Sequence, residues 1–89
     1  MAYRSKTERF RDVKKLGRII RKHRKKKGWT QHDLAQRSGC DARQISRIEL
    51  GTHEPRISML YGVLRALGLD LAVTPDKPDR PRPPIEEIF

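Results

Sequence analysis

Residues 28–51 of this 89-residue chain read GWTQHDLAQRSGCDARQISRIELG. Thr30 can cap a first short helix over residues 31–37, because its hydroxyl can accept an otherwise unpaired backbone N–H at the helix start. Gly39 can supply a bend, and Asp41 can cap a second helix that ends near Gly51. The stretch therefore predicts two short helices joined by a tight turn.

The second of these helices has an apolar stripe, Ile45 and Ile48, and a polar face opposite to it on a 3.6-residue wheel. That face is formed by Arg43, Ser46, Arg47 and Leu50. A helix-turn-helix unit places such a helix in the major groove of DNA, where Arg can grip O6 and N7 of guanine. We expect base contacts from four residues of this helix: Ala42, Arg43, Gln44 and Arg47.

Phosphate contacts are expected from three further residues: Thr30, Gln31 and Ser46. Thr30 and Gln31 stand at the start of the first helix, where backbone N–H groups and the helix dipole favour an anion. Glu49 needs another position, since a carboxylate that faced the DNA would repel phosphates. The wheel places Glu49 toward the body of the domain.

The charge of the chain agrees with a polyanionic partner. The net charge is +10, and residues 1–52 carry 16 Lys and Arg against five Asp and Glu, whereas residues 53–89 carry five against six. This asymmetry favours nucleic acid, and a solvated basic helix face is the alternative.

Several classes of function are disfavoured. Cys40 is the single cysteine, so no intrachain disulfide forms and a Cys-based zinc site is not expected; the three His residues lack ligand spacing. We expect no metal, no cofactor, no catalytic constellation and no small-molecule substrate, so the chain is not predicted to be an enzyme. Without a membrane-length apolar run or an N-terminal apolar signal segment, a reducing cytoplasm is the expected compartment.

Two more helices complete an expected all-α bundle. Residues 1–12 form an arm or a short helical extension, and a basic amphipathic helix begins at Val13 and ends before Gly28. A fourth helix is expected over residues 57–67, poorly capped by Arg56. Its apolar face is predicted to comprise Ile57, Leu60, Tyr61, Leu64 and Leu67.

Residues 69–74 alternate between apolar and polar side chains, as a half-buried strand does. A lone strand lacks a partner for its backbone, so we expect it to pair with the same strand of a second subunit, through Leu69, Leu71 and Val73. The alternative is an irregular apolar segment folded over the core. The domain is thus predicted to span residues 13–74, with the strand at its end.

Residues 75–89 hold five of the six prolines among charged residues, so we expect a disordered tail. Ile85, Ile88 and Phe89 either form an unremarkable end or dock into a partner.

Residues 16–51, with the pattern LG…I…R…GWTQ…LA…G…IS.IE.G, resemble the lambda-repressor/Cro-type (XRE) helix-turn-helix family. The resemblance implies a compact bundle of four to five helices whose second and third form the DNA-reading unit. It also implies that Gln31 supports phosphate contact and base readout and that Arg24 pairs with Glu49. The sequence departs from the pattern at Ala42, often Gln in the family, and at His23, where an aliphatic residue is usual.

The second half, PRISMLYGVLRALGLDLAVTPD followed by the Pro-rich tail, is similar to HipB-type antitoxins. That similarity implies a bacterial homodimer that represses its own operon at a palindromic operator, with half-sites about 34 Å apart, and that binds a HipA-like serine/threonine kinase toxin. The alternatives are a stand-alone repressor of phage or host genes and a toxin-binding adaptor whose DNA affinity is incidental.

Overall fold

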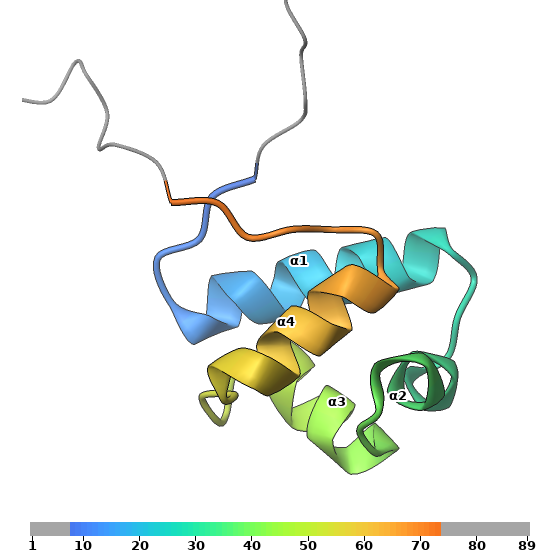
Figure 1. Cartoon of the computed structure of the whole chain (residues 1–89). Coiled ribbons are helices and arrows are strands. Elements are labelled where there is room, and N and C mark those ends of the chain that lie inside the picture. The colour runs from blue at the N-terminus through green and yellow to red at the C-terminus, as the bar shows by residue number, and fades with distance from the viewer. Residues whose placement is uncertain (1–7, 74–89) are drawn as a thin grey trace, which may run out of the picture.

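The computed structural model describes residues 8–73, which form four helices. They are α1 (Val13–Lys26), α2 (Gln31–Ser38), α3 (Ala42–Leu50) and α4 (Ile57–Ala66). Helices α2 and α3 lie at one end of the bundle, and α1 and α4 make up the rest of it (Figure 1). The expected all-α architecture is confirmed for the described residues. The predicted tail, with Ile85, Ile88 and Phe89, lies outside them.

Two capping boxes set the starts of α2 and α3. At α2 the Thr30 hydroxyl accepts a hydrogen bond from the Asp33 backbone N–H at 3.0 Å, and the Asp33 carboxylate accepts one from the Thr30 N–H at 2.9 Å. This Thr30 N–H lowers the pKa of Asp33, because it stabilises the carboxylate. Asp41 and Gln44 repeat the arrangement at α3, at 2.8 and 3.0 Å.

Gly39 ends α2 with a φ of 79°, in the left-handed region that favours glycine. Its backbone N–H donates to the Ala35 carbonyl at 3.0 Å, and Asp41 caps α3 only two residues later. The short turn between the two helices is therefore fixed by one glycine and one capping residue.

The core receives one fully buried side chain from each helix: Ile20, Leu34, Ile45 and Val63. The other buried residues of the same cluster are Leu16, Ala35, Ile48, Leu60, Leu64 and Leu67. Trp29, at the entrance to α2, packs against this cluster and is half-buried. All four helices thus share a single core, as a small domain requires.

The predicted apolar face of α4 is partly wrong. Val63 is fully buried, whereas Ile57 and Tyr61 keep 74% and 41% of their surfaces exposed. Ile57 opens the helix at the edge of the core, and Arg56 before it makes no side-chain capping bond. The buried stripe is built on residues 60, 63, 64 and 67 instead.

Residues 69–73 form no strand within the single chain described. Leu69 and Leu71 are half-buried against the core, and Val73 is fully exposed. Pairing with a second subunit therefore stays a prediction. At the other end of the described range, residues 8–12 form no helix before Asp12 caps α1 with a 2.8 Å bond from the Lys15 N–H.

Candidate nucleic-acid interface

The exposed face of α3 carries two arginines one helical turn apart. Arg43 and Arg47 are both exposed and make no ion pair within residues 8–73. Leu50, one turn beyond Arg47, is 63% exposed. Two mobile guanidinium groups on one side of a rigid helix can reach base edges or phosphates at the same time.

The residues beside Arg43 and Arg47 on α3 are less available for a contact with DNA than the sequence predicts. Ala42 and Ser46 are half-buried, and the Gln44 side-chain oxygen accepts from the Asp41 N–H. The Gln44 amide therefore holds the start of α3, and only its NH₂ group remains for a partner. Of the four residues expected to contact DNA bases, Arg43 and Arg47 have the side chains most available for such a contact.

The start of α2 offers backbone N–H groups and two partly engaged side chains. The Thr30 hydroxyl oxygen accepts from the Asp33 N–H in the capping box and keeps its O–H as a donor, and Gln31 Nε2 donates one of its hydrogens to Oε1 of Glu49 at 3.1 Å. The N–H groups of Gln31 and His32 fall in the first turn, where the helix itself supplies no acceptor. A phosphate placed there would be bound by these N–H groups and by the helix dipole.

Arg24 and Glu49 form a buried ion pair between α1 and α3. Arg24 Nε donates to Oε2 of Glu49 at 2.6 Å and Nη2 donates to Oε1 at 3.0 Å, while Nη1 donates to the Trp29 carbonyl at 2.8 Å. The hydrogen bonds from Arg24 to Glu49 raise the pKa of Arg24. With Gln31 on the same carboxylate, one network joins α1, the start of α2 and α3.

Two features of the described residues carry no periodic signal and were missed from the sequence. The Arg37 guanidinium stacks over the Trp29 ring at 4.3 Å, and Lys27 Nζ lies 5.3 Å from the ring centroid. Separately, the Glu8 carboxylate bonds to the Lys22 ammonium and lies 2.6 Å from Nε2 of His23. The one hint of the second contact is that His23 replaces the aliphatic residue usual in similar chains.

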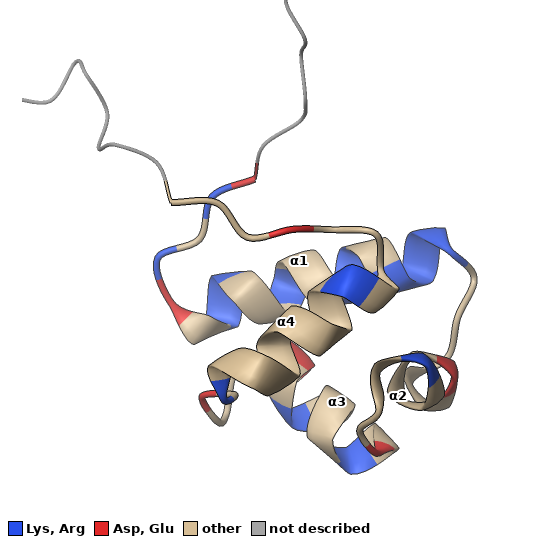
Figure 2. Ribbon diagram, viewed as in Figure 1, with Lys and Arg blue, Asp and Glu red and all other residues tan. Residues whose placement is uncertain are grey.

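Lys and Arg segments recur along α1 and at both ends of α3, and acidic segments are few (Figure 2). Within the described range no helix is long and apolar enough to cross a membrane. The geometry thus combines a rigid exposed helix, an anion-accepting helix start and a surrounding positive field.

Residues 20–73 match the sequence family described as Helix-turn-helix, which is more than half of the chain. The chain belongs to the helix-turn-helix family. An uncharacterised HTH-type transcriptional regulator of Methanothermobacter thermautotrophicus is 40% identical over 50 residues, or 56% of this chain and 72% of that protein. The HTH-type transcriptional regulator SlrR of Bacillus subtilis is 40% identical over 57 residues, or 63% of this chain and 38% of SlrR.

Solved structures share the fold. The restriction-modification controller protein C.Esp1396I matches with a TM-score of 0.61 and 34% identity, over 65% of this chain and 75% of that one. HipB in its complex with the O4 20-mer matches with a TM-score of 0.72 and 22% identity, over 80% of this chain and 100% of HipB. The same match is found for HipB in the HipA-HipB-O2-O3 complex. The expected relation to XRE-type regulators is confirmed.

Proposed function

We propose that this protein is a transcriptional regulator that binds double-stranded DNA in a sequence-specific manner, with α3 in the major groove. The observation that carries the proposal is the exposed Arg43–Arg47 pair on a helix that is held by the buried Arg24–Glu49 network. A recognition helix must be positioned to within a fraction of an ångström for its side chains to discriminate bases. The two relatives described above are HTH-type transcriptional regulators.

In this arrangement the phosphate backbone is bound on either side of the groove. The first-turn N–H groups of α2 take one phosphate, and Gln31 is held beside it by Glu49. Arg43 and Arg47 then carry the discrimination between bases, with a methyl contact from Ala42, while Ser46 contacts a phosphate. We assign Gln44 to the support of the α3 N-terminus first and to DNA second, because its oxygen is already bonded.

Selection of bound sequences from a random duplex library tests the proposal. A pool that converges on a palindrome, with half-site centres about one helical turn apart, is the expected result for a dimer. Arg43→Ala and Arg47→Ala should each weaken the binding free energy for the selected duplex by about 1–3 kcal/mol. Each should also reduce the base preference at one position of the binding site. Arg65→Ala, at an exposed arginine of α4, is the control and should leave the preference unchanged. A pool that stays random would reject sequence-specific binding.

We further propose that the regulator acts as the antitoxin of a HipA-like kinase, with autoregulation of its own operon. What supports this role is the fold match over the full length of HipB, together with the Pro-rich residues 75–89 that end in Ile85, Ile88 and Phe89. The alternative is a stand-alone repressor without a toxin partner.

The antitoxin role is tested by the neighbouring reading frame and by co-expression. A kinase-like gene in the same operon, whose toxicity this chain relieves, is expected; an isolated gene would favour the stand-alone repressor. Removal of residues 75–89 should spare DNA binding and abolish the relief of toxicity. If relief survives the truncation, the tail is not the surface that binds the kinase.

A further inference from the structure

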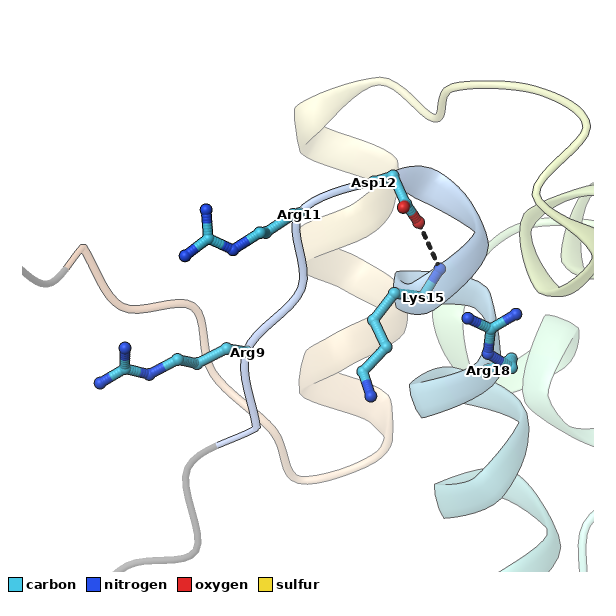
Figure 3. A pocket seen from close by; sticks show the side chains of 5 residues that line it. All are labelled: Arg9, Arg11, Asp12, Lys15 and Arg18. Carbon is cyan, nitrogen blue, oxygen red and sulfur yellow. Dashed lines mark hydrogen bonds between the residues drawn. The ribbon is translucent and has the colours of Figure 1, made fainter. Parts of the chain in front are cut away.

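A shallow basic hollow of about 330 Å³ lies beside the start of α1. It is lined by Arg9, Arg11, Asp12, Lys15 and Arg18. Arg9 and Arg11 extend from the segment before α1, while Lys15 and Arg18 stand on the first two turns of the helix (Figure 3). This end of α1 lies at the opposite side of the bundle from the α2–α3 turn (Figure 1).

Positive charge in the hollow is not neutralised within the described residues. None of its four cationic side chains forms an ion pair among residues 8–73. The one carboxylate, Asp12, is occupied as the N-cap of α1, where it accepts from the Lys15 N–H at 2.8 Å. The four cationic side chains therefore create a positive potential that attracts an anion, and no ion pair among residues 8–73 offsets it.

Glu8 organises this surface from outside it. Its carboxylate bonds to Lys22 and to His23, 14 and 15 residues further along the chain. These contacts hold the backbone of the segment before α1 along the helix, while the Arg9 and Arg11 side chains extend outward from it (Figure 3). A backbone segment that is ordered in advance loses less entropy when a ligand binds to the side chains it carries.

We propose that this basic hollow is a second contact surface for the phosphate backbone of duplex DNA, independent of α3. Three of its four cations are arginines, whose planar guanidinium groups match phosphate oxygens in a bidentate geometry. The hollow is open and has no apolar floor of buried side chains, so it suits a backbone that passes over it more than an enclosed small molecule. The inference rests on the proposed function for its choice of DNA as the polyanion.

The test starts from the full chain with Arg43→Ala and Arg47→Ala, which removes the two arginines of α3 proposed to contact DNA; this variant is called the α3-silenced chain. The probe is a random-sequence duplex. Anisotropy titrations over a salt series give both the affinity and its salt slope. Adding Arg11→Gln and Arg18→Gln should lower the affinity in low salt by about tenfold and reduce the slope by about 2, because each substitution removes one cation from a phosphate. The matched control adds Arg56→Gln and Arg65→Gln instead. Arg56 directly precedes α4 and Arg65 lies in its last turn; both are exposed, and their substitution should change the affinity less than threefold.

An equal loss in both sets would show that only total charge matters and would overturn the proposal. A polyglutamate peptide that binds with the same affinity and slope as the duplex would overturn the assignment to nucleic acid. If the chain with native Arg43 and Arg47 selects no sequence while the α3-silenced chain still binds duplex through the hollow, the proposed function fails and this inference stands.

Glu8→Gln separates an ordered surface from simple charge. The substitution raises the net charge by one, so electrostatics alone predicts tighter binding of the random duplex. The proposal predicts weaker binding, because Arg9 and Arg11 are released from α1. Binding in the α3-silenced chain that is unchanged or tighter after Glu8→Gln would contradict the role given to this contact.

Discussion

Glu49 is the residue at which three parts of the bundle meet. Its two carboxylate oxygens accept from Arg24 of α1 and from Gln31 of α2, while its backbone belongs to α3. The Glu49 side chain is 3% exposed, and no buried polar side-chain atom of the described residues lacks a hydrogen-bond partner. The sequence predicts the inward position of Glu49 from the helical wheel alone, but not the bond to Gln31, because amide contacts between helices leave no periodic pattern.

Glu49→Gln should destabilise the fold by about 3 kcal/mol, because it leaves the Arg24 guanidinium buried without its counter-charge. Urea unfolding followed by circular dichroism measures the change. Glu54→Gln, at an exposed position in the loop before α4, serves as the control and should stay within about 0.5 kcal/mol of the native chain. Equal stability of the two variants would show that the ion pair contributes nothing.

The contacts of the Glu8 carboxylate are expected to be lost over a defined pH range. The hydrogen bonds from Lys22 and then His23 hold the pKa of the Glu8 carboxyl at about 2, below its ordinary value of 4.5. Because the pKa of Glu8 is lower in the folded state, its contacts stabilise the fold at pH values above the pKa of the unfolded state. This contribution to the free energy of unfolding is lost as the pH falls from about 4.5 toward 2. An NMR titration of the Glu8 carboxyl carbon should give a midpoint near 2; a midpoint near 4.5 would show that the segment before α1 is free.

The packing of α1 on α3 depends on Gly17. A Cβ atom at this position would come within 2.5 Å of the carbonyl oxygen of Glu49, so the two backbones touch where other residues would hold them apart. The sequence shows a glycine inside a basic helix but not its reason. Such a glycine costs helix propensity and is explained only when the facing helix is known.

Gly17→Ala should therefore destabilise the domain by about 1–3 kcal/mol, against the gain of about 1 kcal/mol that helix propensity alone predicts. Thermal unfolding measures the sign. Gly62→Ala in α4 is the comparison, since a Cβ there meets only the Ser38 carbonyl oxygen at 3.3 Å and should be tolerated better. A more stable Gly17→Ala protein would mean that α1 and α3 can separate without loss.

The two capping boxes explain why the helix-turn-helix could be predicted well. Thr30, Asp33, Asp41 and Gln44 set the starts of α2 and α3 by contacts over three residues, which a sequence displays directly. Helix α4 lacks such a box, and its apolar residues outnumber the positions that the core can cover. For that reason the sequence assigned Ile57 and Tyr61 to the core, whereas Val63 fills it.

Over the whole molecule, the two ends of the described chain leave on one side and the α2–α3 turn lies on the other (Figure 1). A second subunit that pairs through residues 69–73 would thus leave α3 accessible to DNA. Leu71→Pro should shift the proposed dimer toward monomer, because proline removes a backbone donor from the paired strand. Light scattering measures the mass, and Ala72→Ser, at an exposed neighbour, is the control. A dimer that survives Leu71→Pro would contradict pairing through this segment.

We propose that Arg43 and Arg47 read the bases of the operator. The direct measurement is the ratio of affinities for the selected duplex and a scrambled one, taken at a single salt concentration. We expect the native chain to show a ratio of about 10³ or more, and the double variant Arg43→Ala with Arg47→Ala to lose nearly all of it while it keeps most of its affinity for the scrambled duplex. A double variant that retains the full ratio would show that another surface reads the sequence.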